Sequence, residues 1–557
     1  DHIYAMFLES GAGCLNAVYE STTGGEFWTK LLVNHDDFDP MNNGDYCQGI
    51  YDAALGVSPI NENLFFLGGI TLWRYDGNLT RIAAEFGSPP FQDVLPNYVH
   101  ADKHYVYFSP NDPRRVYVTT DGGVAMSEND GQSWRGLNKG YVTTQNYAIS
   151  HSNDGTLALC GNQDNGSLIV LGDNASDPKV GFEMTGGDGM GNDMSQISAI
   201  VFTSSQNGAV NRIDAAQRNG SSFPVGSISG SGGPFVTRVR LWESINDPSS
   251  RDSVYFSVEG SQIAIDVSNG IVRSYSANVD PVQPAAIVIG PSIKVFSGSQ
   301  MLTTSATDST NFTSTNGSEG TITYNADGSF DVNVTFATAP SENSNIFVSF
   351  EQRYAANSVL ILESNNLNSG LTSYQFEHRL ENSLNPGDAI LVQDPVQSIL
   401  ANTGGSTSTG GIRIYRNVLN FTENPVPIDI PGVSGQVSAL DFTPDGDHLF
   451  VGTQNGSLYR VSGLKNLYTA ADLNQITVSN LSSASVGAGG ITSVAVDPNN
   501  PERVVVTAGA YGLSDRIKIS TNALSGGTFM NIHGNLPGMP IYSAEIDRND
   551  PNIILVG

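Results

Sequence analysis

The stretch FSPNDPRRVYVTTDGG, residues 108–123, carries the pattern that decides the fold. An apolar strand end is followed by a turn rich in Pro, Asn and Asp, and then by alternating apolar residues that stop at glycine. Period-2 alternation beside a turn that Pro and Asn preset predicts an antiparallel hairpin. We therefore expect two paired strands in this stretch.

The same phrase recurs along the chain. Further copies are VSPINENLFFLGG from Val57, SHSNDGTLALCGNQDNG from Ser150, FTPDGDHLFVGTQNG from Phe442, VDPNNPERVVVTAG from Val496 and IDRNDPNIILVG from Ile546. A repeat of several short strands predicts blades arranged around an axis, because one repeat cannot bury its apolar faces alone. The fold class we expect is all-β, a β-propeller of seven to ten four-stranded blades.

A second motif follows the hairpin. SENDGQSW, residues 127–134, matches the Asp-box pattern S-x-D/N-x-G-x-S/T-W, and STTGGEFW, residues 21–28, is a degraded version. In such a turn a short polar side chain satisfies backbone amides, glycine takes a positive φ, and the tryptophan packs between blades. We interpret the motif as structural.

The repeat vanishes between about residues 278 and 378. Alternating segments rich in Ser, Thr and Asn, such as GTITYNADGSFDVNVTFAT, replace it and predict an inserted β-rich, sandwich-like domain. We expect propeller blades in residues 1–277, the insertion in 278–378, and further blades in 379–557, with blade-like sequence resuming near residues 387–392. Either the insertion binds a partner, or the fold tolerates it without a function of its own.

Composition narrows the partners. The 557 residues include 55 Asp and Glu against 26 Lys and Arg, a net charge of -29 at pH 7. This balance repels phosphate and anionic lipid, so nucleic acid is excluded as a partner. No apolar run is long enough to span a bilayer, and we expect no membrane insertion.

The cysteines and chain ends leave alternatives open. Three cysteines, Cys14, Cys47 and Cys160, make no metal-spaced cluster and allow at most one internal disulfide, with Cys14 and Cys47 as one possible pair. The chain lacks an initiator Met, which suggests processing or truncation. Residues 553–557 read as a strand without its partner, so either further sequence follows or this strand pairs with residues 3–7.

The first candidate site is HADKH, residues 100–104. With period 2, His100, Asp102 and His104 would point the same way, and two imidazoles with a carboxylate could bind a ligand or a divalent metal. The alternative is a hydrogen-bonded structural cluster.

Three further motifs place polar groups beside glycine at strand ends: Asp121 in DGG, Gln163, Asp164 and Asn165 in QDNG, and Asp188 in GGDG. Glycine there allows close approach of the backbone, so that these side chains could point into one shared cleft. The alternative is that they make turn hydrogen bonds only. Because oxygen ligands suit calcium, the segment from Asp188 to Asp193 is a candidate calcium site, the one cofactor that we consider.

The succession HADKH, DGGVAMSENDGQSW, QDNGS and GGDGMG resembles the bacterial sortilin-like propellers with Asp-box (BNR) repeats, found in large secreted proteins of the Bacteroidota. The resemblance covers about residues 51–208 and weakens afterwards. It implies a propeller exported to the cell surface, often by type IX secretion, although no export signal is visible here. Proteins of this kind are often described as hydrolases because of their fold alone, and a fold does not determine function.

We therefore expect an extracellular or cell-surface protein that acts as a non-catalytic platform for binding or adhesion, with a glycan or a cell-surface protein as partner. His100, Asp102, His104, Gln163 and Asn165 are the candidate binding residues.

One alternative is a glycoside hydrolase, the enzyme class that we consider, which uses two carboxylates. Asp121, Asp164 and Asp188 are its candidate catalytic residues. Another alternative is a structural subunit of a surface or secretion-related assembly.

Overall fold

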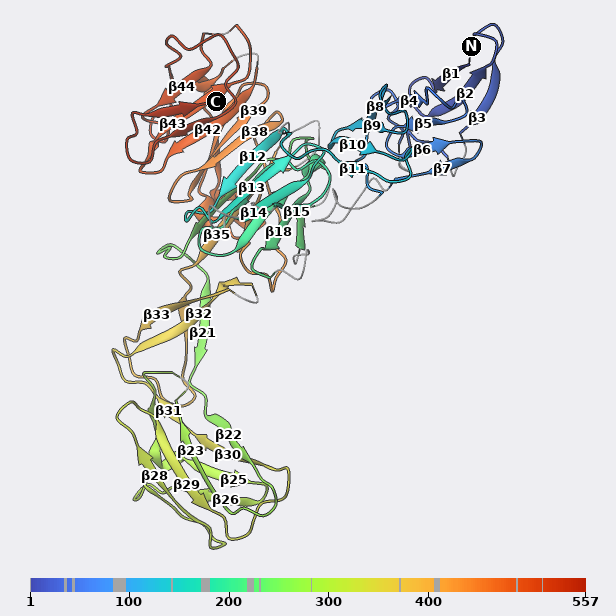
Figure 1. Cartoon of the computed structure of the whole chain (residues 1–557). Helices are drawn as coiled ribbons and strands as arrows, with labels where there is room; N and C mark the ends of the chain where they lie inside the picture. Colours follow the sequence, from blue (N-terminus) through green and yellow to red (C-terminus); the bar gives the residue numbers. More distant parts are fainter. Residues whose placement is uncertain are drawn as a thin grey trace. The chain divides into compact units, whose positions relative to one another are not determined.

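The computed structural model describes residues 2–34, 38–42, 46–83, 97–141, 144–171, 181–217, 225–229, 232–281, 283–369, 372–404, 411–486, 489–512 and 514–557. The chain divides into two compact units. Unit 1 comprises Asp1–Trp242, Ile399–Arg416 and Pro425–Gly557, and unit 2 comprises Glu243–Ser398 and Asn417–Asn424. Figure 1 colours the chain from blue to red along the sequence.

Unit 1 is built from antiparallel sheets whose strands mostly follow chain order. The first three sheets are β1 (Ile3–Leu8), β2 (Leu15–Ser21), β3 (Thr29–Val33); β4 (Ala54–Val57), β5 (Phe65–Gly68), β6 (Leu72–Tyr75), β7 (Leu79–Arg81); and β8 (Lys103–Phe108), β9 (Val116–Thr120), β10 (Gly123–Ser127), β11 (Arg135–Gly136). The next two are β12 (Asn146–His151), β13 (Leu157–Asn162), β14 (Ser167–Leu171), β15 (Gly181–Thr185); and β16 (Asn192–Met194), β17 (Ile200–Ser204), β18 (Val210–Asp214), β19 (Val225–Ser229).

The sixth sheet combines one strand that precedes most of unit 2 in the sequence with three strands that follow most of it. The remaining sheets are β20 (Val239–Ser244), β35 (Gln397–Thr403), β36 (Ile412–Arg416), β37 (Ile428–Ile430); β38 (Val437–Phe442), β39 (His448–Thr453), β40 (Leu458–Ser462), β41 (Thr477–Asn480); β42 (Ile491–Asp497), β43 (Asn500–Ala508), β44 (Ile517–Ser520), β45 (Met530–Asn531); and β46 (Ala544–Ile546), β47 (Ile554–Val556). The described helical turns are η2 (Gln206–Gly208), η3 (Gly290–Ser292), η4 (Leu464–Asn466), η5 (Ala470–Gln475) and η6 (Ser482–Ala484).

The hairpin predicted from residues 108–123 is present. Strand β8 pairs antiparallel with β9, so that Val106 faces Val118 and Phe108 faces Val116. Val116 and Val118 are fully buried, because alternate residues of a strand point to one face and this face packs on the neighbouring sheet. Burial of these alternating residues drives the repeat to stack sheet on sheet.

The later sheets of unit 1 are arranged radially. A cavity of about 650 Å³, here called the central channel, is walled by residues of β12, β16, β20, β38, β42 and β46, the first strands of six successive sheets, with residues of β47 beside them. First strands that share one cavity are the arrangement of propeller blades. The predicted fold class is confirmed: an all-β chain with propeller sheets and a β-rich insertion.

Both turns that match the Asp-box pattern make the same hydrogen bonds. The amide of Gly131 donates to Ser127 Oγ (2.8 Å), and Trp134 Nε1 donates to the carbonyl of Gly131 (3.1 Å). In the degraded copy, the amide of Gly25 donates to Ser21 Oγ (2.9 Å) and Trp28 Nε1 to the carbonyl of Gly25. These side chains stabilise turns, as we predicted.

A third turn of this kind, between β44 and β45, escaped the sequence analysis. The amide of Asn522 donates to Ser520 Oγ (3.2 Å), and the amide of Thr528 donates to Asn522 Oδ1 (3.0 Å). The sequence STNALSGGTF holds extra residues before its glycines, and a buried Phe529 stands where the pattern has tryptophan. The longer loop hides the match.

Unit 2 contains a β-sandwich. Its two four-stranded sheets are β22 (Ser261–Val267), β30 (Asn345–Phe350), β25 (Lys294–Ser297), β26 (Gln300–Thr303); and β23 (Ser274–Val279), β29 (Phe330–Thr335), β28 (Glu319–Tyr324), β27 (Asn311–Phe312). Their inner faces share one core that includes Val295, Phe330 and Val348. Two-stranded sheets complete the unit: β21 (Ser253–Ser257) with β34 (Ala389–Gln393), β24 (Ile287–Val288) with β31 (Gln352–Arg353), and β32 (Val359–Asn368) with β33 (Ser373–Arg379).

Unit 2 extends on both sides of residues 278–378, the range predicted for the insertion. Residues 387–392, where we expected blades to resume, lead into β34, which pairs with β21 inside unit 2. Strands of a sandwich and of a blade share the same period-2 pattern, so alternation alone did not locate this boundary.

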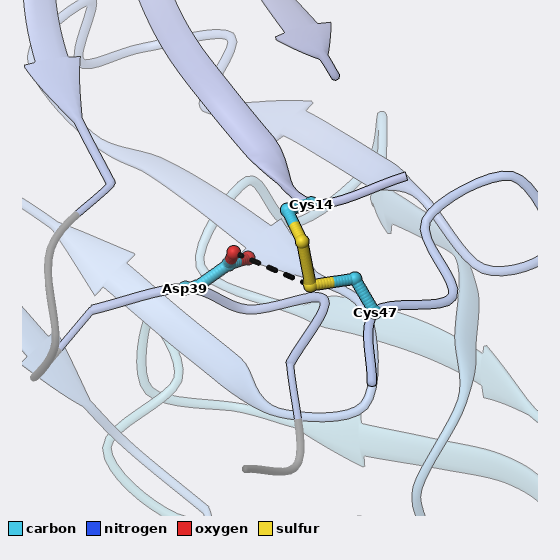
Figure 2. A group of neighbouring side chains, drawn as sticks. All are labelled: Cys14, Asp39 and Cys47. Atoms are coloured by element: carbon cyan, nitrogen blue, oxygen red, sulfur yellow. Dashed lines mark hydrogen bonds between the residues drawn. A yellow bond between two sulfur atoms is a disulfide. The ribbon is translucent and has the colours of Figure 1, made fainter. Parts of the chain in front are cut away.

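Cys14 and Cys47 form a disulfide, and Cys160 is free and half-buried. Figure 2 shows the bridge beside Asp39, whose carboxylate accepts the amides of Leu15 and Met41. Burial raises the pKa of Asp39. The bridge ties the loop before β2 to the loop before β4.

The chain ends pair locally. Strand β1 pairs with β2, and β47 pairs with β46. Within the described ranges no pairing joins β47 to residues 3–7, the alternative that we considered. The described part of the chain has no helix that is both long and apolar enough to cross a membrane.

Candidate functional site

The candidate residues come from one kind of connection. In a four-stranded antiparallel meander, the turn between the second and third strands and the segment leaving the fourth strand lie at the same end of the sheet. Asp121 lies between β9 and β10, and Asp164 between β13 and β14. His100 and Asp102 follow β7, and Asp188 follows β15. The topology therefore gathers them along one edge of unit 1.

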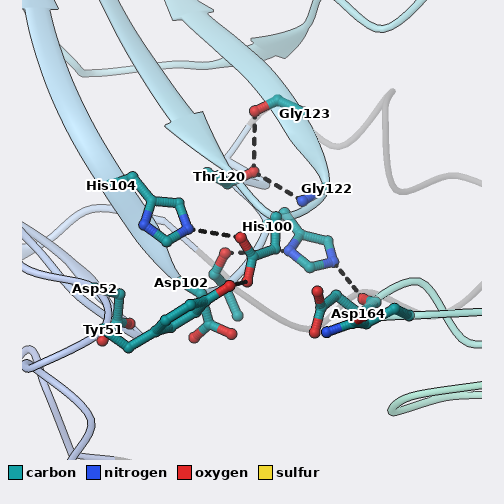
Figure 3. Close-up of polar contacts among 12 residues, drawn as sticks. Tyr51, Asp52, His100, Asp102, His104, Thr120, Gly122, Gly123 and Asp164 are labelled. Atoms are coloured by element: carbon teal, nitrogen blue, oxygen red, sulfur yellow. Dashed lines mark hydrogen bonds and ion pairs between the residues drawn. The ribbon is translucent and has the colours of Figure 1, made fainter. Parts of the chain in front are cut away.

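Asp121 is held by two donors. Its Oδ2 accepts the hydroxyl of Tyr51 at 3.0 Å, and its Oδ1 accepts Nε2 of His104 at 2.6 Å. Figure 3 shows the phenol of Tyr51, from the connection between β3 and β4, and the ring of His104, from β8, with Asp102 and Asp164 beside them. These two donors, from Tyr51 and His104, fix the direction of the Asp121 carboxylate.

Asp102 lies against a second carboxylate, that of Asp52. Gln48 donates through Nε2 to Asp52 Oδ2 at 3.1 Å and also to Asp102 Oδ1, and thereby bridges the two side chains. Asp52 is fully buried. Burial, together with the charge of Asp102, raises the pKa of Asp52, and burial together with the charge of Asp121 raises the pKa of Asp102. Neither is an ordinary surface carboxylate.

The turn that carries Asp164 is tied to its neighbours through the backbone. His100 Nε2 donates to the carbonyl of Asp164 at 2.9 Å, and the amide of Asp164 donates to Asp188 Oδ1 at 3.0 Å. Asn165 Nδ2 donates to the carbonyl of Asp121 at 3.3 Å. Gln163 Oε1 accepts the hydroxyl of Tyr147 at 3.0 Å. These bonds leave the carboxylate of Asp164 directed at the other acids.

Three carboxylates converge. Asp102, Asp121 and Asp164 each offer one oxygen, and these oxygens all lie within 4.8 Å of one another. Burial, followed by the charges of Asp121 and Asp188, raises the pKa of Asp164 to about 7. Such a set could hold a hard divalent cation such as calcium, or could share one proton between an acid and a base.

Beside these acids lies a cavity of about 590 Å³, here called the acidic pocket. Its wall includes Tyr46, Gln48, Tyr51, Tyr98, His100, Asp102, Gln163, Asp164, Asn165, Glu183, Asp188, Gln206 and Phe235. Tyr46 and Tyr51 are 58% and 56% exposed. The pocket therefore combines carboxylates and amides with accessible aromatic faces.

The prediction that His100, Asp102 and His104 share one strand face is wrong. Strand β8 begins only at Lys103, and Asp102 has a φ of 60°, so the alternation of side chains does not extend back to it. The three residues still reach one site, but with different partners. The metal-competent group joins Asp102 to Asp121 and Asp164, without either histidine.

Asp193 does not join this group, contrary to the proposed calcium segment. Its carboxylate accepts the amides of Met194 and Leu241, and it lies 3.5 Å from Arg240. Asp188 and Asp193 are separated because β16 begins between them and carries Asp193 toward the central channel. A calcium site using both residues is thereby removed.

Glycine allows the close approach predicted for these turns. A Cβ at Gly189 would meet the carbonyl oxygen of Gly166 at 2.1 Å, and one at Gly161 would meet that of Met190 at 1.9 Å. No heavier residue fits without moving the backbone. Asp164 itself has a φ of 60°, a strained region for a residue with a Cβ.

Sequence reasoning missed Gln48, Tyr51 and Asp52, which lie in the connection between β3 and β4. They carry no motif of their own. Their signal is positional, because this connection is equivalent to those that carry His100 and Asp188. Counting strands from each turn would have pointed to them.

No protein-family model and no curated protein matches the chain. Among solved structures it is similar to U3-55K, at 9% identity over 91% of this chain and 88% of that one, with a TM-score of 0.32. The WD40 repeats of RRP9 give 9% identity, 81% and 86% coverage, and a TM-score of 0.34. An ancestral GH74 enzyme is 11% identical over 94% of this chain and 70% of that one, with a TM-score of 0.21. Likeness at this level carries no argument about ligand or activity.

Proposed function

We propose that the chain is a secreted or cell-surface β-propeller whose acidic pocket binds a glycan. The observation that carries this proposal is the exposure of Tyr46 and Tyr51 beside Asp102, Asp164 and Asn165 in one cavity. A sugar ring offers an apolar face, which packs on an aromatic ring, and hydroxyls, which donate to carboxylates and exchange hydrogen bonds with amides. The pocket supplies both kinds of partner.

The negative charge of the pocket limits the kinds of glycan that it can bind. Asp102, Asp121, Asp164 and Asp188 lie in or beside the cavity, and carboxylates repel other anions. The ligand is therefore a neutral or amino sugar, and not a sulfated or uronic one. A cell-surface protein as partner would have to present such sugars to this site.

A glycan array followed by calorimetry on the selected glycan tests the proposal. Tyr51→Ala removes an aromatic wall of the pocket, and we expect it to weaken binding at least about tenfold. Tyr105→Ala is the matched control, since Tyr105 is an equally exposed tyrosine on β8 that does not line the cavity. Failure to bind any glycan, or equal loss in both variants, would contradict the proposal.

A second candidate, a glycoside hydrolase, is favoured by one specific observation. Asp121 and Asp164 have oxygens within 4.8 Å, and their surroundings differ: Asp121 accepts hydrogen bonds from Tyr51 and His104, whereas burial and neighbouring charges raise the pKa of Asp164 to about 7. A protonated and an ionised carboxyl at roughly 5 Å are the pair of a retaining enzyme. Asp164 would act as acid and Asp121 as nucleophile.

Incubation of the wild-type chain with the selected glycan distinguishes the two candidates. Hydrolysis that is lost in both Asp121→Asn and Asp164→Asn would establish the enzyme. An intact glycan after prolonged incubation, with binding retained, leaves the non-catalytic platform. Sequencing of the products by mass spectrometry measures both outcomes.

The extracellular location is supported by the disulfide between Cys14 and Cys47, since such bridges persist in oxidising compartments. Protease shaving of intact source cells, followed by peptide identification, tests it. Recovery of peptides only after lysis would contradict a surface location.

A further inference from the structure

The central channel contains two arginines on neighbouring positions of one segment. Arg238 directly precedes β20, and Arg240 lies within it, and both line the cavity of about 650 Å³. The channel is walled by first strands of the propeller sheets and is distinct from the acidic pocket. A buried cation is costly unless it is paired, and this chain, with a net charge of -29, is rich in carboxylates that could pair with it.

Arg240 is paired with two carboxylates. Its Nε donates to Asp441 Oδ1 at 2.8 Å, and its Nη1 lies 3.5 Å from Asp193 Oδ2. The two carboxylates come from the sheets on either side, β16 and β38. Arg240 therefore holds neighbouring blades together, and its charge is neutralised within the protein.

Arg238 lacks such partners. Its Nη1 donates to the carbonyl of Tyr147 at 3.2 Å, whereas its Nε is buried and makes no hydrogen bond. In the described ranges no carboxylate lies within ion-pair distance of its guanidinium, and burial lowers its pKa. A guanidinium carries five N–H donors, so most of those of Arg238 have no hydrogen-bond partner among the described residues.

Glu545 also lines the channel, but no ion pair joins it to Arg238 among the described residues. Burial raises the pKa of Glu545, and the charges of Asp441, Arg240, Arg548 and His151 also act on it. Tyr147 separates Arg238 from the acidic pocket, because its hydroxyl donates to Gln163 there while its carbonyl accepts from Arg238. An unneutralised cation thus faces an open cavity.

We propose that Arg238 binds the oxyanion group of a ligand that enters the central channel. The planar guanidinium fork matches a carboxylate, sulfate or phosphate with two parallel hydrogen bonds. Among the described residues that line the channel, Arg238 is the one cation without a carboxylate partner, so the site suits a single small anionic group. This inference does not depend on the glycan proposed for the acidic pocket, which repels anions.

The test uses the full chain with sodium sulfate and sodium glucuronate, each compared with sodium chloride at equal ionic strength. Thermal melting and calorimetry are the readouts. We expect a saturable rise in Tm with at least one of the two anions, and its loss in Arg238→Gln. Arg114→Gln, which removes an exposed arginine paired with Asp130, keeps the response.

The pattern of responses identifies the ligand chemistry. Glucuronate alone indicates a carboxylate, and a response to both indicates a general oxyanion site. Arg238→Lys keeps the charge but not the fork, so it should weaken binding at least about fivefold, and it replaces Arg238→Gln if that variant fails to fold. Equal rises in wild type and variant, as sulfate gives by surface exclusion, or no saturable binding, would overturn the proposal.

Discussion

Replacing Asp121 with asparagine tests whether three carboxylates meet at the acidic pocket. The substitution keeps the size of the side chain and an acceptor for the hydroxyl of Tyr51, but removes one negative charge. Asp164 should respond most, because Asp121 is the largest charge contribution to its raised pKa after burial. The stability of the variant should therefore depend on pH differently from that of the wild type.

The magnitude follows from the separation. At 4.8 Å, the upper limit of the separation between these oxygens, two unit charges repel by about 3.5 kcal/mol at an effective dielectric constant of about 20, and by about 0.9 kcal/mol at about 80. Asp164 is only half-buried, so solvent screening places the effect near the lower value, about 1 kcal/mol. Removing Asp121 should then lower the pKa of Asp164 from about 7 by a little under one.

The sign follows from linkage. A carboxyl whose pKa is raised on folding binds a proton in the folded state at pH values where the unfolded chain has lost it. Its contribution to stability is complete below the ordinary pKa and is lost as the pH rises through the raised one, here about 7. Asp121→Asn shrinks this loss, so the variant should lose less stability than wild type between about pH 5 and about pH 8.

Thermal melting at several pH values between these limits measures the effect. We expect the difference in Tm between variant and wild type to grow by about 1 to 2 °C as the pH rises, given the size of unit 1. Asp280→Asn, which removes an exposed carboxylate far along the chain, should leave the difference constant. Parallel Tm curves for Asp121→Asn and wild type would refute the convergence of charges.

Three further predictions concern the fold around the site: denaturant unfolding measures those on the disulfide and on the tryptophans, and calorimetry with the selected glycan measures that on Gly189. Reducing the bridge between Cys14 and Cys47, or replacing both with serine, should cost about 3 to 4 kcal/mol for a separation of 33 residues; no change would mean that the bridge does not form. Gly189→Ala should abolish binding at the acidic pocket, because its Cβ would meet a carbonyl oxygen at 2.1 Å, and retained binding would contradict the packing. Trp134→Ala, at 3% exposure, should cost about 3 to 5 kcal/mol, and Trp28→Ala, at 43%, far less; equal costs would contradict the assigned burial.

The fold could be predicted because its signals are local. Hairpins such as β8 with β9 follow from alternation and turn residues within about 16 positions, and the polar turns that end in Trp28 and Trp134 follow from a short motif. The boundary of the insertion could not be predicted. The strand β34 alternates like a blade strand, and only its pairing with β21 assigns it to unit 2.

The site was predictable in part for the same reason. Asp121, Asp164 and Asp188 each stand beside glycine at a strand end, which marks them locally, and the structure brings their turns together. Asp102 has a positive φ, and the alternation of side chains along a strand does not predict the position that this gives it in the site. Asp52 has no motif, and its importance depends on its contact with Asp102 through Gln48, a long-range relation.

The claim on which the proposed function depends is that one pocket, formed by separate sheets, receives the ligand. A crystal structure of the chain with the glycan selected by the array tests it most directly. We expect density for the sugar against Tyr51 and within hydrogen-bonding distance of Asp164. Density confined to unit 2 or to the central channel, with the acidic pocket filled by water, would contradict the account.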